Sequence, residues 1–196
     1  MINDKSSRKN RTKELSSNRS YKKRLQEYYI KCFISEFSKV LLFLCIFMFL
    51  GLTKEYFAAL LFLMILRHNG GGLHFKHYFS CLLVSFSFLY ASIFLALRLQ
   101  PLRLILLSCT LLCALLGYFL VPITSANRPD ATKEQKNVSK RNTLIIILAF
   151  FLLVCICQLN SYYYIAFWTL ILHITQLIIA HSIKEVRKNV QLGNQI

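Results

Sequence analysis

The sequence predicts an all-α membrane protein with about six transmembrane helices, on the evidence of its composition, its apolar runs and the places of its charges. Hydrophobic residues make up 56% of the 196 residues and charged residues only 16%, which excludes a water-soluble globular domain. Several charge-free runs are long enough to cross a bilayer as helices. The remaining charges, 24 Lys and Arg against 8 Asp and Glu, gather between those runs, as basic cytoplasmic loops do. Because the apolar runs are too long for a nucleic-acid-binding domain, we expect no nucleic acid partner despite the formal net charge of +16.

The N-terminal part is predicted to lie outside the bilayer. Residues 1–20 are polar and are expected to form a disordered basic tail, with no signal peptide. From Tyr21 onward, apolar residues recur at helical spacing while basic residues occupy the other faces. This pattern predicts a basic amphipathic helix that lies on the anionic inner leaflet of the lipid bilayer and leads into the first span. For residues 1–20, a solvated tail that only fixes the topology is the alternative.

Six spans follow from the apolar runs. Lys54-Glu55 separates the first two, because one continuous helix would bury this charged pair at mid-membrane. The last two come from a charge-free run of 42 residues, 142–183, which is twice too long for one span and is expected to fold back at Asn160-Ser161. The predicted spans lie at about 33–52, 56–66, 78–97, 104–121, 143–160 and 162–181.

The charges also predict the topology. Six spans with both termini in the cytoplasm leave only three basic residues outside, Lys54, Arg98 and Arg103, whereas five spans would export the basic loop near residue 130. Residues 21–181 then form a single polytopic membrane domain, and residues 182–196 form a cytoplasmic tail. The sequence leaves the oligomeric state open, a homodimer included.

One segment, residues 67–81, carries the chemistry, and we call it the motif segment. It holds three of the five histidines, three consecutive glycines that end the preceding helix, and Cys81 near the start of the next one. The positive end of a helix dipole and the nearby Arg67 and Lys76 favour a thiolate at such a cysteine. The seven cysteines do not form a disulfide framework, since most lie in or beside apolar spans. Neither the Cys155-x-Cys157 pair nor the Cys109-x3-Cys113 pair is assigned to a metal.

Three roles compete for these residues. Cys81 is a nucleophile with a histidine as its base, or His74, His77 and Cys81 bind Zn²⁺ without an evident fourth ligand, or all three are packing and interfacial residues. On a continuous helix the spacing favours His77 as the base, because His74 would lie about 10.5 Å away along the axis. His74 can serve only if the glycines let the chain fold back. We predict no metal and no cofactor.

Arg67, Gly71-Gly72, His74 and Cys81 together resemble the core motif of the accessory gene regulator B (AgrB) family, membrane cysteine endopeptidases of Gram-positive quorum sensing. The chain length, the basic N-terminus, the six spans and the basic loop that opens at Val121-Pro122 are also similar to that family. Phe75 departs from the small residue that is usual after the histidine.

The resemblance implies a multi-pass protein of the cell membrane with its active site near the cytoplasmic face and a His74–Cys81 dyad. Its substrate would be an AgrD-like propeptide, whose C-terminal tail is removed through an acyl-thioester so that a thiolactone or lactone forms. Candidates for the oxyanion hole or for substrate contacts are Arg67, Gly71, Gly72, His77 and Ser80. The alternative is a non-catalytic peptide exporter or immunity-type protein of related architecture.

Two further sets of residues carry weaker expectations. The basic loops are expected to attract an acidic propeptide tail or simply to hold the topology. Two histidines lie in the last apolar run, and we expect an inter-helix hydrogen bond for His173 and an interfacial position for His181.

Overall fold

The computed structural model describes Ile30 and residues 34–71, 77–121 and 133–193, with side chains described up to Val186. The predicted tail over residues 1–20 and nearly all of the predicted interfacial helix lie outside these residues. The chain divides into two units, residues 1–46 and 47–196, and each is described by itself.

All described elements are helices, which confirms the all-α class. The first covers residues 34–49; in the N-terminal unit, Lys39 Nζ on this helix pairs with Glu36 Oε1 at 2.7 Å, one turn away. The other helices are α2 (Thr53–Gly70), α3 (Tyr78–Arg98), α4 (Arg103–Leu120), α5 (Lys133–Ile156) and α6 (Ser161–Gly193).

Four of these helices, α3 to α6, are long and apolar enough to cross a membrane, so the chain is a helical membrane protein. The helix over residues 34–49 and α2 correspond to the first two predicted spans, which stay predictions. Charge counting ended the second predicted span at residue 66 and the last at 181, whereas α2 continues to Gly70 and α6 to Gly193.

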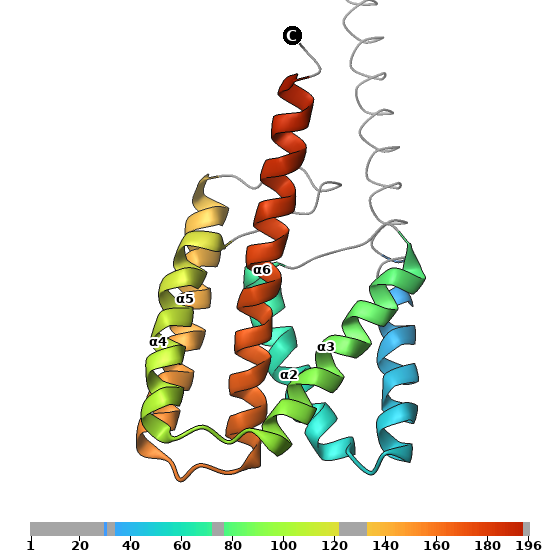
Figure 1. Cartoon of the computed structure of the whole chain (residues 1–196), viewed down its shortest axis with the longest axis vertical. Coiled ribbons are helices and arrows are strands. Elements are labelled where there is room, and N and C mark those ends of the chain that lie inside the picture. The colour runs from blue at the N-terminus through green and yellow to red at the C-terminus, as the bar shows by residue number, and fades with distance from the viewer. Residues whose placement is uncertain (1–29, 31–33, 72–76, 122–132, 194–196) are drawn as a thin grey trace, which may run out of the picture. The chain divides into compact units, whose positions relative to one another are not determined.

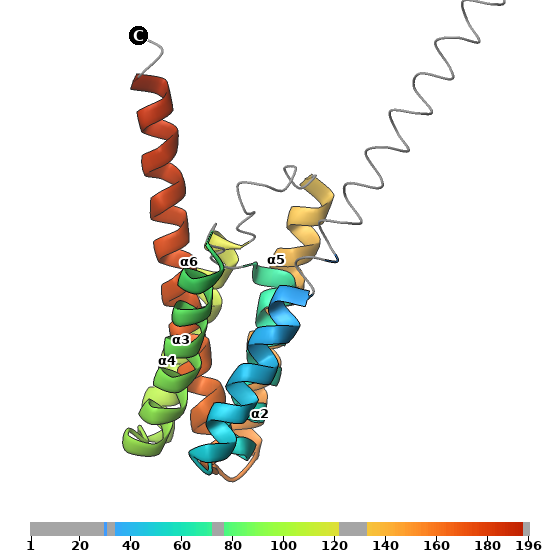
Figure 2. The ribbon, with the colours of Figure 1, turned by 90° about the vertical axis from the view of Figure 1, so that its right-hand side faces the viewer.

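Within the second unit, α6 is the central helix. It packs against α2, α3 and α4, while α5 packs against α4 and α2, and Figures 1 and 2 show this arrangement. Half of the membrane-crossing stretch of α6 is buried in the protein, compared with 22–28% in α3, α4 and α5. An apolar core lies where α4, α5 and α6 meet with the end of α2. Its buried residues are Leu66, Leu106, Cys113, Ala114, Val121, Ile147, Phe150, Val154, Phe167, Leu170, Ile174 and Leu177.

The break between α5 and α6 has a clear local cause. Asn160 Oδ1 accepts a hydrogen bond from the Tyr162 backbone N–H at 3.0 Å, so Asn160 caps α6 as asparagine commonly does. The same end of the bundle is held by two side-chain bonds to loop carbonyls, from Arg103 Nη2 to Cys157 O at 2.8 Å and from Trp168 Nε1 to Leu99 O at 2.9 Å. The 42-residue run therefore folds back beside the predicted Asn160-Ser161 turn.

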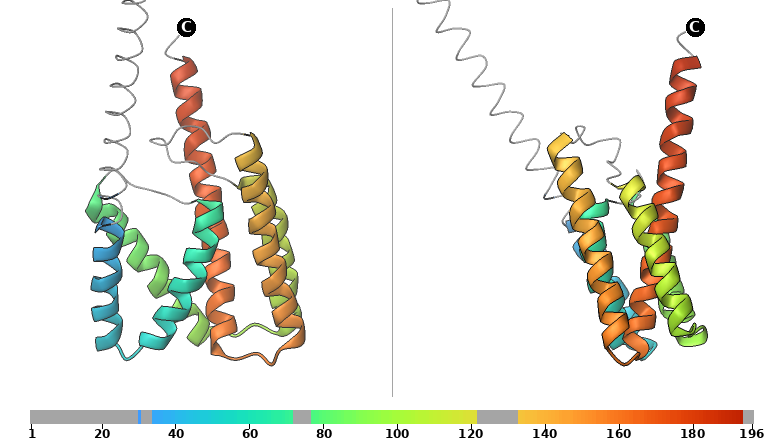
Figure 3. Two further views of the ribbon diagram at one scale, coloured as in Figure 1. Left: turned by 180° about the vertical axis from the view of Figure 1, so that it is seen from behind. Right: turned by 90° about the vertical axis from the view of Figure 1, so that its left-hand side faces the viewer.

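The two helix ends that flank the motif segment lie at the opposite end of the bundle. The C-termini of α2 and α4, the N-termini of α3 and α5 and the C-terminal half of α6 all lie at this end (Figures 1 and 3). The motif segment thus joins two helices at one end of the bundle, away from the Asn160 turn.

Candidate active site

The last turn of α2 runs from Arg67 to Gly70. Gly70 is the last residue of the helix, and Gly71 follows with φ 78° while its N–H bonds Arg67 O at 3.1 Å. A positive φ is accessible to glycine without steric cost, so Gly71 is the residue that lets α2 end here. Gly72 and His74, both predicted site residues, lie outside the described residues.

Cys81 lies in the first turn of α3. Its backbone N–H donates to His77 O at 3.2 Å, and its side chain is buried, with 9% of the residue exposed. The positive end of the α3 dipole therefore acts close to the thiol. Ser80, next to it, and His77 are exposed.

The start of α3 keeps the spacing that favours His77. His77 is the N-cap residue of this helix, with φ −94° and ψ 131°, and its carbonyl accepts the Cys81 N–H at 3.2 Å, as in a helical turn. The relation of i to i+4 between His77 and Cys81 is therefore the one that the sequence argument assumed. His74 as the base stays a prediction, because residues 72–76 are not described.

Arg67 reaches from α2 to two other helices. Its Nη2 donates to Gln176 Oε1 on α6 at 3.3 Å, and its guanidinium lies 5.9 Å from the centre of the Phe88 ring on α3. Phe88 follows Cys81 by two helical turns, so both residues share one face of α3. Gln176 is a functional candidate that sequence reasoning missed, although a glutamine in an apolar helix was a visible signal.

His173 lies one turn before Gln176, and the expectation of an inter-helix hydrogen bond for it is wrong among the described residues. His173 is fully buried, and neither of its ring nitrogens has a hydrogen-bond partner among the described residues. Instead it packs against Gly70, where an added Cβ would lie 3.1 Å from His173 Nε2. His181 is exposed, with Nδ1 3.8 Å from Glu185 Oε1.

The last turn of α2 therefore collects polar groups from three helices, and we call them the α2-end cluster. Asn142 Nδ2 on α5 donates to Asn69 Oδ1 at 3.2 Å and completes the set. Two members of the cluster, His173 and Gln176, are buried, and buried polar side chains in a membrane protein are costly and usually serve a function. The α2-end cluster comprises Arg67, Asn69, Asn142, His173 and Gln176.

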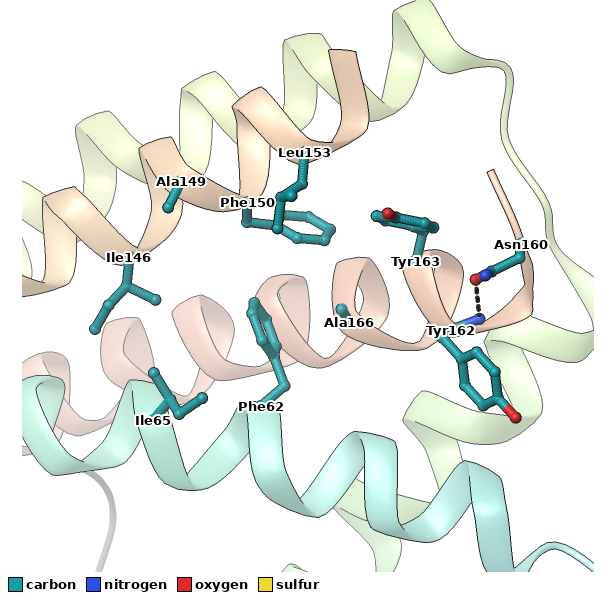
Figure 4. A pocket seen from close by; sticks show the side chains of 10 residues that line it. All are labelled: Phe62, Ile65, Ile146, Ala149, Phe150, Leu153, Asn160, Tyr162, Tyr163 and Ala166. Carbon is teal, nitrogen blue, oxygen red and sulfur yellow. Dashed lines mark hydrogen bonds between the residues drawn. The ribbon is translucent and has the colours of Figure 1, made fainter. Parts of the chain in front are cut away.

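A hollow of about 540 Å³ between α2, α5 and α6 is a different feature. It is lined mostly by aliphatic and aromatic side chains and includes Asn160 and Tyr162 at the turn end (Figure 4). No residue of the motif segment lines it, so it carries no part of the candidate site.

The metal hypothesis gains no support from the described residues. No three histidine, cysteine or acidic side chains come together among them as a metal site. The sequence-based Zn²⁺ set includes His74, which lies outside this part of the chain.

The fold and the site define a helical membrane protein with a cysteine-histidine segment joining two helices at a polar end of its bundle. The family model described as "Accessory gene regulator B" matches residues 8–178, and the chain belongs to this AgrB family. Membership assigns it a role in quorum-sensing propeptide processing in general. Comparison with curated proteins and with solved structures gives no significant match.

Proposed function

We propose that this protein is a membrane-embedded cysteine endopeptidase that removes the C-terminal tail of an AgrD-like propeptide and enables its cyclisation. The position of Cys81 carries the proposal. In a chain of the AgrB family, it is a buried thiol in the first turn of a helix that follows a glycine-terminated helix. A helix N-terminus stabilises a thiolate, which is the reactive form of cysteine.

The reaction balances with two residues. His74 takes the thiol proton, and Cys81 Sγ attacks the carbonyl carbon before the tail. The peptide C–N bond breaks, the leaving amine takes the proton from His74, and the remaining peptide is held as an acyl-thioester on Cys81. An internal Cys or Ser of the propeptide then attacks the thioester, and its proton returns to the Cys81 sulfur as the thiolactone or lactone leaves.

The thioester keeps the acyl group activated for cyclisation after the peptide bond has broken. Exchange of one thioester for another is nearly balanced in free energy, whereas closing a ring from a free acid in water is uphill. Backbone N–H groups in the first turn of α3 and at Gly72 are the proposed oxyanion donors; the Gly71 N–H already bonds Arg67 O. Ser80 and His77 are exposed beside them and are proposed substrate contacts.

We also propose that the end with the motif segment faces the cytoplasm and the anionic inner leaflet. Basic residues of described segments support this: Arg67 lies in the last turn of α2, and the start of α5 carries Lys133, Lys136, Lys140 and Arg141. The turn end carries fewer, namely Lys54, Arg98 and Arg103. Lys and Arg accumulate on the cytoplasmic side of membrane proteins.

The same basic start of α5 is the proposed attraction for an acidic propeptide tail. Its lysines and arginine are mostly exposed, and Lys140 Nζ lies 5.3 Å from the centre of the Tyr118 ring. Long-range attraction raises the local concentration of an oppositely charged peptide without a fixed contact.

The test is coexpression with the propeptide from the neighbouring reading frame, with loss of the tail followed by mass spectrometry. We expect Cys81→Ala to abolish cleavage and Cys113→Ala, a buried cysteine on α4, to leave it intact. Cleavage that survives Cys81→Ala would refute the enzyme and favour an exporter or immunity-type protein. If cleavage is lost in His77→Ala but kept in His74→Ala, the general base is His77 and the choice of His74 is wrong.

A further inference from the structure

His173 is a buried polar residue that the proposed reaction does not use. It lies on α6, is fully buried, and has no hydrogen-bond partner for either ring nitrogen among the described residues. An imidazole in this state is a costly way to fill space, because Leu or Phe would fill it without burying polar atoms. The residue therefore calls for a reason beyond packing.

The residue against which His173 packs is a glycine at the end of a helix. Gly70 is the last residue of α2, and its φ is not in the positive range that favours glycine. An added Cβ would lie 3.1 Å from His173 Nε2, which is tighter than an ordinary contact, so a side chain at position 70 would press the ring and the helix end apart. The unpartnered imidazole thus meets the end of α2 at close range.

The place of the contact links it to the motif segment. Gly70 is the last residue of α2, immediately before the glycines that lead to His74. One turn earlier on α2 and one turn later on α6, Arg67 bonds Gln176 at 3.3 Å. The same face of α6 therefore holds the end of α2 at two points, through a hydrogen bond and through a close ring-to-backbone contact.

We propose that His173 is a positioning residue of the active site: its imidazole packs against Gly70, fixes the end of α2, and so sets where the chain leads toward His74. This rests on the proposed function, and it assigns His173 no contact with the reacting atoms. Small displacements of a catalytic group lower the rate strongly while substrate binding is kept. The expected signature is a lower kcat at nearly constant KM.

A double-mutant cycle on the contact tests the proposal with purified protein in anionic liposomes and the synthetic propeptide of the neighbouring reading frame. We expect Gly70→Ala and His173→Ala each to lower kcat by at least about tenfold. The double variant should be no slower than His173→Ala alone, because the added methyl group then meets no ring. Gly117→Ala is the matched control: this buried helical glycine offers ordinary contact, with Ile147 Cδ1 at 3.4 Å from the added Cβ. If the fold-decrease of kcat in the double variant equals the product of the two single decreases, the two residues act independently and the proposal is refuted.

A second readout needs no propeptide and separates positioning from folding. Alkylation of Cys81 by iodoacetamide at about pH 6.5, where an unassisted thiol is protonated, reports whether a histidine still activates the cysteine. We expect His173→Ala to slow this alkylation at least about fivefold, and Thr169→Ala, equally buried one turn away on α6, to leave it unchanged. Equal rates in the two variants would refute the positioning role. Cleavage by Cys81→Ala in the liposome assay would instead refute the proposed function itself.

Discussion

Replacing Gln176 tests whether α6 holds Arg67. Gln176→Leu keeps the side-chain volume roughly constant but removes the carbonyl that accepts from Arg67 Nη2. Hydrogen bonds to charged groups contribute about 1.5–3 kcal/mol. Because the distance of 3.3 Å is at the long end for such bonds, we expect the lower value, about 1.5 kcal/mol. For a chain of this length, that lowers the Tm by roughly 3–6 °C.

The protein carries its own probe for this measurement. Trp168 is the single tryptophan, it lies on α6, and its Nε1 donates to Leu99 O at 2.9 Å. Its fluorescence should therefore change when the helices separate on heating in detergent micelles. Gln158→Leu, at an exposed loop position, is the matched control and should leave the Tm within about 1 °C.

A double-mutant cycle identifies the cause of the loss. Removing one member of a buried polar pair is more costly than removing both. Arg67→Met combined with Gln176→Leu should therefore be destabilised less than the sum of the two single variants, with a coupling free energy of about 1 kcal/mol. Strictly additive losses would show that the two side chains do not interact in the membrane protein.

Two other expectations concern the opposite ends of the bundle. Asn160→Ala removes the cap of α6 and should cost about 1 kcal/mol, measured as a lower Tm, whereas Gln158→Ala in the same loop should not; an unchanged Tm would show that the cap does not hold the turn. Replacing Lys133, Lys136, Lys140 and Arg141 together by Gln should raise KM for a propeptide with an acidic tail. The difference should shrink above about 0.5 M salt, where charges are screened within a few ångström; a difference independent of salt would argue against electrostatic attraction.

The parts of the fold that depend on local signals could be predicted from the sequence. The fold-back of the long apolar run is an example, since a polar pair in the middle of 42 uncharged residues leaves few places for a turn. Asn160 caps α6 through its own backbone neighbours, so no knowledge of the tertiary structure was needed. The lengths of two charge-free runs likewise predicted the helices α3 and α4.

The end of α2 shows what the sequence could and could not provide. The consecutive glycines predicted where the helix ends, and α2 does end at Gly70. The hydrogen-bond partner of Arg67 was out of reach, because Gln176 lies 109 residues away in the chain. A partner at such a separation cannot be assigned from spacing. For the same reason the environment of His173 was predicted wrongly: its neighbour is the backbone of a glycine on another helix.

In the proposed reaction, the burial of Cys81 bears on how one cysteine would serve both cleavage and cyclisation. As a nucleophile it needs a stabilised thiolate, which the start of α3 offers. Its thioester, however, must survive until the propeptide's own Cys or Ser attacks, and water competes throughout that time. A buried thiol, with 9% of its residue exposed, in the first turn of α3 meets both needs, because the helix dipole acts through the backbone while the packed side chains limit access of water. Greater exposure of Cys81 should therefore change the product before it changes the rate, from the cyclic peptide toward the hydrolysed linear acid.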